Sequence, residues 1–268
     1  MTEENEISYP NISQSWGIVG ITILSMLLLS PIYLLLKNIT GKDLSFLVYY
    51  LFAMGASFWI AHRKRKYWTT VSQYYFEFGS VKIIILVSIA VIALQTGIIS
   101  PIINLMPMPE FIKKSFSELG KQNSIFSFIT IVMAAPVLEE LIFRGIILDG
   151  LLKRYSPLKS IIVSSILFGV IHLNPWQFVA AFIGGIFSGW VYYKTQKLTL
   201  SILIHFVNNL FAFSSMLFTD TEITMDKSLA ELYGGMLNLV MITFGAIIIA
   251  AICLYFLRFE FKNREIQL

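Results

Sequence analysis

The stretch PVLEELIFRG, residues 136–145, places Glu139, Glu140 and Arg144 inside one of the most apolar regions of the chain. A charged side chain at the centre of a membrane helix costs roughly 2.5–3.5 kcal/mol, so three of them need compensation or water. Glu140 and Arg144 are four residues apart and can pair on one helix face. Glu139 is rotated about 100° from that face, and the pair therefore leaves it unneutralised.

Two later apolar segments carry further polar groups. His172 ends the run SILFGVIHL, and His205 and Asn209 share a helix face in LSILIHFVNNLF. At about 1.5 Å per residue, these residues and Glu140 lie roughly 12–20 Å from the basic residues at the proposed cytoplasmic ends of their spans, Lys153, Lys159 and Lys197. We therefore expect one layer of polar groups around a midplane cavity. The alternative is that these residues form a buried polar cluster with only a structural role.

Such a set suits the hydrolysis of a peptide bond, which needs an activated water, a proton shuttle and donors to the developing oxyanion. A carboxylate beside a histidine can activate water, and a histidine and an asparagine amide can donate to an oxyanion. The H-E-x-x-H pattern of zinc proteases is absent. Two glutamates and two histidines could still ligate a zinc ion, so this alternative stays open although no cofactor is expected.

The composition indicates the environment of these residues. The chain of 268 residues is 56% hydrophobic and 13% charged, with a mean hydropathy of +0.74. Soluble domains contain about 25% charged residues, so this chain is expected to be a polytopic membrane protein. Its excess of Lys and Arg is then a signal of topology, and no nucleic-acid partner is expected. The single cysteine, Cys253, excludes a disulfide within one chain.

A hydrocarbon core of about 30 Å needs roughly 20 apolar residues as a helix. The sequence therefore predicts an all-α fold with about eight transmembrane helices in a single membrane domain, residues 1–268, whose catalytic core is 124–218. A short interfacial helix, EFIKKSFSELG, is expected before that core, with Phe111, Ile112, Phe116 and Leu119 roughly on one side. The eight predicted spans are 16–36, 44–61, 81–100, 124–152, 160–173, 176–193, 198–218 and 236–257.

Charge in the connecting segments predicts the orientation of these spans. With the N-terminus in the cytoplasm, 13 of the 20 Lys and Arg residues fall on the cytoplasmic side and six on the outer side, with Arg144 inside a span. The predicted location is thus the cell membrane, with both termini cytoplasmic. The basic run at 63–66 is interpreted as a topology anchor.

Three short motifs carry a family resemblance. Glu139, Glu140 and Arg144 match E-E-x-x-x-R, Phe168 and His172 match F-x-x-x-H, and His205 and Asn209 match H-x-x-x-N. In this order and spacing they resemble the CAAX protease and bacteriocin-processing family (CPBP, or Abi), which includes the type II CAAX prenyl endopeptidases. The resemblance covers about residues 124–218.

The resemblance implies an intramembrane endopeptidase of the glutamate type that needs no metal. It implies that Glu139 and His172 activate the water, that His205 and Asn209 form the oxyanion hole, and that Glu140 and Arg144 brace the site. Exchange of the roles of the two glutamates remains an alternative. Phe168 would pack beside His172.

Eukaryotic members of this family remove the last three residues of prenylated proteins, and many bacterial members are linked to peptide or bacteriocin processing and immunity. The Ile-, Lys- and Asn-rich composition is typical of a low-GC bacterium, which favours a peptide or membrane-protein substrate in the lipid bilayer over a prenylated one. A non-catalytic immunity or scaffold protein that binds a peptide is the main alternative. A transporter with a midplane proton site is another, although no inverted repeat is detected.

Overall fold

The computed structural model describes residues 8–70, 72–120, 124–218 and 227–265. This part of the chain is helical and contains no strand, and the all-α membrane fold is confirmed. The elements, with η for π-helices, are α1 (Ile12–Thr40), α2 (Lys42–Thr69), α3 (Val81–Leu94), η1 (Gln95–Ile99), α4 (Ser100–Asn104), α5 (Glu110–Gly120), α6 (Ile125–Phe128), η2 (Ile129–Ala134), α7 (Ala135–Ile142), η3 (Phe143–Leu148), α8 (Asp149–Leu152), α9 (Pro157–Val170), α10 (Pro175–Thr195), α11 (Leu198–Phe218), α13 (Leu229–Leu232) and α14 (Met236–Glu265).

A helix lies over most of each of the eight predicted spans. Six helices of the described residues are long and apolar enough to cross a membrane: Ile12–Thr40, Lys42–Thr69, Val81–Asn104, Ile125–Leu152, Leu198–Leu217 and Met236–Lys262. Helix α9 has only 14 residues, and α10 is not among the six. The protein is thus a polytopic helical membrane protein, and the count of eight spans stays a prediction.

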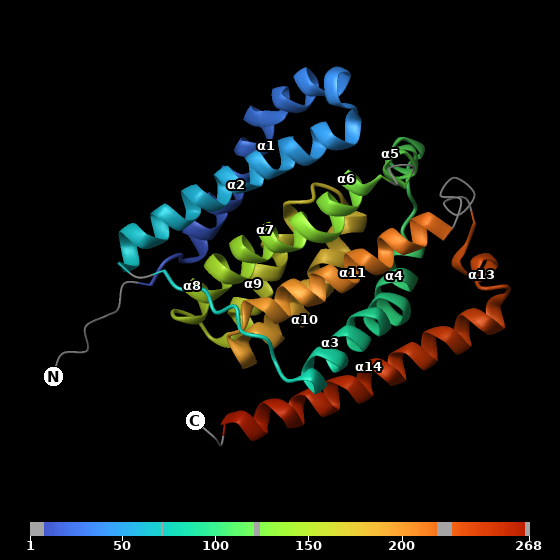
Figure 1. Cartoon of the computed structure of the whole chain (residues 1–268). Helices are drawn as coiled ribbons and strands as arrows, with labels where there is room; N and C mark the ends of the chain where they lie inside the picture. Colours follow the sequence, from blue (N-terminus) through green and yellow to red (C-terminus); the bar gives the residue numbers. More distant parts are fainter. Residues whose placement is uncertain (1–7, 71, 121–123, 219–226, 266–268) are drawn as a thin grey trace.

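The described residues form three apolar cores, two large ones and a smaller one that includes Leu148 and Leu198. The hairpin of α1 and α2 lies along one side and α14 along the other, with α7 and α9–α11 between them (Figure 1). One core joins α1, α2, η3 and α9 through residues such as Ile18, Met54 and Phe143. The second joins α3, α10, α11 and α14, and includes Val87 and Leu257.

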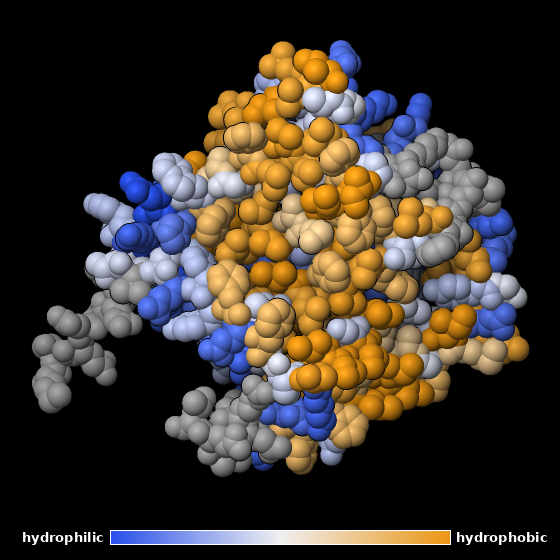
Figure 2. Space-filling view, in the orientation of Figure 1, coloured by the Kyte–Doolittle hydropathy of each residue, from blue (hydrophilic) through white to orange (hydrophobic). Residues whose placement is uncertain are grey.

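The surface suits a lipid environment. Figure 2 shows apolar residues over most of one face, with hydrophilic residues toward its edges. Large apolar side chains are exposed, and Leu28 and Leu35 reach 75% and 72%. Four helices have basic residues in or directly after their last turn, namely α2, α8, α10 and α14. These helix termini lie on the same side of the bundle (Figure 1). That arrangement agrees with the cytoplasmic assignment, which stays a prediction.

The segment 125–152 forms one uninterrupted helix, here called the central helix, made of α6, η2, α7, η3 and α8. Its two π-turns flank α7, which carries Glu139 and Glu140. A π-turn disturbs the regular hydrogen-bond pattern, and such turns are frequent at functional sites. Side chains from other helices bind carbonyl groups in both: Asn209 donates to Ile131, Ser164 donates to Phe143 and Arg65 donates to Gly145.

The interfacial helix predicted from EFIKKSFSELG is found as α5. Phe111 is 70% exposed and Ile112 is half-buried. The side chains of Phe116 and Leu119 lie outside those that the structure describes. The position of α5 at the membrane surface stays a prediction.

Arg65 ties α2 to the central helix and is not simply an exposed member of the basic run. Its side chain is 4% exposed, and its Nη2 lies 2.6 Å from Asp149 Oδ2. The hydroxyl of Tyr192 in α10 donates to the other carboxylate oxygen at 3.4 Å. Because both charges are paired and hydrogen-bonded, this contact can fix the register of α2 against the central helix.

Gly150 lets the chain before α1 pack on the central helix. A Cβ there would lie 2.3 Å from the carbonyl oxygen of Tyr9 and 2.4 Å from Pro10. Gly150→Ala is expected to lower the free energy of unfolding by about 1–3 kcal/mol, since overpacking forces the backbone to shift. Gly184→Ala is the matched control, because nothing lies within 4 Å of that Cβ position. Equal thermal midpoints for the two variants in detergent would contradict this prediction.

Candidate active site

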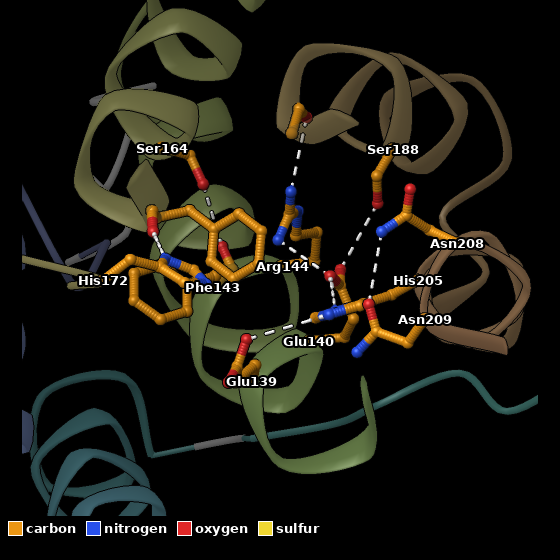
Figure 3. A network of polar contacts seen from close by, with 12 residues as sticks. Glu139, Glu140, Phe143, Arg144, Ser164, His172, Ser188, His205, Asn208 and Asn209 are labelled. Carbon is orange, nitrogen blue, oxygen red and sulfur yellow. Dashed lines mark hydrogen bonds and ion pairs between the residues drawn. The ribbon is translucent and has the colours of Figure 1, made fainter. Parts of the chain in front are cut away.

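The motif residues come together between the central helix, α9, α10 and α11 (Figure 3). Helix α7 supplies both glutamates, η3 supplies Arg144, α11 supplies His205 and Asn209, and His172 lies in the turn that follows α9. Asn174 caps α10 directly after that turn, with its side chain accepting from the Gln177 N–H. The turn thus places His172 at the end of a short helix, as its position in the sequence indicates.

Glu140 is the most engaged carboxylate of the site. It is 1% exposed, and its Oε1 lies 2.9 Å from Arg144 Nη1 and 3.1 Å from His205 Nδ1. Its Oε2 accepts a hydrogen bond from Ser188 at 3.3 Å. Because a carboxylate only accepts, His205 donates through Nδ1 and its ring orientation is set by Glu140.

Glu139 has a different environment from its neighbour. Its Oε1 accepts a 2.6 Å hydrogen bond from the Tyr50 hydroxyl of α2. Its Oε2 is buried and has no hydrogen-bond partner among the described residues. His205 Nε2 lies 3.9 Å from this oxygen. One oxygen of Glu139 is therefore anchored, and the other remains as an acceptor inside the site.

Phe168 packs against three charged or titratable residues of the site. Arg144 Cζ lies 4.4 Å from the centre of its ring, a cation–π contact. The rings of His172 and His205 meet it edge-on, with centroid distances of 5.3 and 5.6 Å. His172 Nδ1 lies 2.9 Å from the Phe168 carbonyl oxygen. A carbonyl only accepts, so Nδ1 carries the proton of this bond and Nε2 is left for water or substrate.

Asn209 lies beside His205 on α11 but makes its own contacts. Its amide nitrogen donates to the Ile131 carbonyl at 2.8 Å, and its amide oxygen accepts from Asn208 at 3.2 Å. In the view of Figure 3, His172 and Asn209 lie on opposite sides of Glu139. The structure thus joins Glu139, Glu140, Arg144 and His205 by direct contacts, and it places His172 and Asn209 at the borders of this group.

Sequence reasoning missed two residues that touch the carboxylates. In the sequence, Ser188 looks like a member of a small-residue stripe with Gly184, Gly185 and Gly189, yet its hydroxyl binds Glu140. Tyr50 lies in a span that no motif marks. A tyrosine in the apolar run LVYYLFAM needs a partner for its hydroxyl, and this is the signal that could have found it.

The geometry of the side chains bears on the zinc alternative. Within residues 8–70, 72–120, 124–218 and 227–265, no three His, Cys, Asp or Glu side chains are grouped so that they could hold a metal ion. The two glutamates pair instead with Tyr50, Arg144, Ser188 and His205. The described residues thus do not fit a metal site, and the absence of a cofactor stays a prediction.

Comparison with known proteins points to the same segment. Residues 121–211 match the family model described as type II CAAX prenyl endopeptidase Rce1-like. A similar protein of Bacillus subtilis (strain 168), named "Putative membrane peptidase YdiL", is 28% identical over 79 residues, which are 30% of this chain and 32% of that protein. The match thus spans about a third of the length of this curated relative. No solved structure matches the chain. The resemblance predicted from the three motifs is confirmed: residues 121–211 are similar to the type II CAAX prenyl endopeptidases, which belong to the CAAX protease and bacteriocin-processing family.

Proposed function

We propose that this protein is an intramembrane endopeptidase that hydrolyses a peptide bond in a membrane-associated peptide or protein. The observation that supports this most directly is the contrast between two adjacent carboxylates. Glu140 binds Arg144, Ser188 and His205, whereas Glu139 keeps one oxygen without a partner among the described residues. A carboxylate with an available acceptor oxygen can take a proton from water, which makes Glu139 the general base.

In the proposed reaction, Glu139 removes a proton from water as the oxygen attacks the carbonyl carbon of the scissile peptide. His172 orients the water through Nε2, because its Nδ1 is held by the Phe168 carbonyl. Collapse of the tetrahedral intermediate breaks the C–N bond. The proton on Glu139 then passes to the leaving amine, so the carboxylate is regenerated.

The oxyanion of the intermediate needs donors, and α11 can supply two. Glu140 holds Nδ1 of His205, so a protonated His205 ring presents its Nε2–H to the site. The amide of Asn209 has two hydrogens, and the Ile131 carbonyl takes one of them. The second remains for the substrate oxygen. Arg144 stabilises Glu140 and thereby the orientation of His205.

The substrate we propose is a peptide or membrane protein without a prenyl group, cleaved in the cell membrane by a protein with both termini in the cytoplasm. To test whether the substrate carries a prenyl group, the purified full chain in lipid nanodiscs is incubated with a set of fluorogenic peptides. The set contains prenylated and unprenylated peptides, and cleavage of each is measured. Binding without cleavage of any peptide would favour the immunity or scaffold alternative. Activity that chelation removes and only zinc restores would establish a zinc enzyme instead.

His172→Ala is expected to lower kcat by about 10²-fold, because the water then loses one of the two groups that orient it. The matched control is His62→Ala, which removes a histidine that binds Tyr74 and Ser72 near the end of α2. Peptide cleavage is measured for both variants after their folding has been checked by thermal unfolding. Equal kcat values for the two variants would remove His172 from the reaction.

A further inference from the structure

Helix α2 contributes a polar group to the site from outside the family-like segment 121–211. Tyr50 is 7% exposed, and its hydroxyl donates to Glu139 Oε1 at 2.6 Å. Bonds between a hydroxyl and a carboxylate have lengths of about 2.5–2.7 Å and are stronger than bonds between neutral groups. The contact therefore has the geometry of a charge-assisted hydrogen bond, made across 89 residues of sequence.

We propose that Tyr50 is a positioning residue that fixes the orientation of the Glu139 carboxylate, so that the oxygen it does not bind faces the nucleophilic water. This inference rests on the proposed function. The terminal torsion of a glutamate side chain is broad, so a carboxylate without an anchor can turn its plane away from the water. By holding Oε1, Tyr50 keeps Oε2 on the side of His205, whose Nε2 is 3.9 Å away.

The position of the hydroxyl is itself well defined. The Tyr50 ring packs in the same buried cluster as Phe143 and Phe168, which line the site. Arg65, further along α2, binds Gly145 and Asp149 of the central helix. Helix α2 is thus fixed to the helix that carries Glu139 at two levels, so the carboxylate is anchored to a rigid element and not to a loop.

The neighbouring Tyr49 provides a matched control. Its hydroxyl also donates a hydrogen bond, at 2.9 Å, but to the Met26 carbonyl of α1 and not to a carboxylate. Tyr49→Phe and Tyr50→Phe therefore remove the same atom from adjacent residues of one helix. A difference between them reports the contact with Glu139 and not the general loss of a hydrogen-bonded hydroxyl.

The first test compares peptide cleavage by wild type and these two variants in lipid nanodiscs. Tyr50→Phe is expected to lower kcat about tenfold with an unchanged KM, the factor that corresponds to one lost hydrogen bond to a charged group. Tyr49→Phe is expected to keep the kcat of wild type. Equal losses in both variants, or a change in KM alone, would make Tyr50 a packing residue.

The second test does not depend on cleavage. A membrane-permeant carbodiimide modifies carboxyl groups, and mass spectrometry reports the rate at Glu139. Labelling is expected to be several-fold faster in Tyr50→Phe than in wild type or Tyr49→Phe, because the hydroxyl no longer covers Oε1. Equal rates would overturn the proposal. If wild type and Glu139→Ala cleave equally, the proposed function fails, and the labelling rates still decide whether Tyr50 holds the carboxylate.

Discussion

Glu139→Gln is expected to reduce kcat by about 10³-fold while the protein stays folded, because the substitution removes the general base and little else. Glutamine has nearly the same shape, and its amide oxygen can still accept the hydrogen bond from Tyr50. The amide cannot take a proton from water. Cleavage of one peptide by wild type and the variant, at matched amounts of folded protein, measures the effect.

Glu140→Gln is the control that separates the two glutamates. This carboxylate is 1% exposed and is bound by Arg144, Ser188 and His205, so its neutralisation leaves the Arg144 charge without a counter-ion. The main effect of Glu140→Gln is therefore expected to be a lower thermal midpoint, and kcat is expected to fall less than in Glu139→Gln. The opposite pattern, a stable but inactive Glu140→Gln beside an active Glu139→Gln, would exchange the roles.

The helices could be predicted because about 20 consecutive apolar residues have few alternatives to a membrane helix. A helix lies over most of each predicted span, and the ends agree best where a turn or basic residue stops the apolar run, as at α11, which begins at Leu198 as expected. The predicted 160–173 span is shifted, since α9 begins at Pro157 and ends at Val170. A proline at the first position and a following turn set those bounds, and hydropathy does not report either.

Within the site, the ion pair along one helix could be predicted, whereas the contacts that Tyr50 and Ser188 make from other helices could not. The i, i+4 spacing predicts the Glu140–Arg144 pair, which is found at 2.9 Å. The contacts of Tyr50 and Ser188 cross 89 and 48 residues of sequence, and no local pattern encodes them. The π-turns around α7 also have no clear sequence signal, although they release carbonyl groups that Asn209, Ser164 and Arg65 bind.

Arg144→Met is expected to lower the free energy of unfolding by about 3–5 kcal/mol, the usual cost of leaving one charge of a buried pair without its partner. Arg144 is 1% exposed, binds Glu140, and lies over the Phe168 ring. Arg63→Met is the matched control, because Arg63 is exposed and such a change costs no more than about 0.5 kcal/mol. Thermal or denaturant unfolding in the same detergent compares them.

The double variant Glu140→Gln/Arg144→Met tests whether charge causes this loss. Without either charge, no unpaired ion of this pair remains buried, and the amide oxygen introduced by Glu140→Gln can still accept from His205 Nδ1. The double variant is therefore expected to be more stable than Arg144→Met alone. If it is less stable, the contribution of Arg144 comes from its packing against Phe168, and the ion pair is not what holds His205 in place.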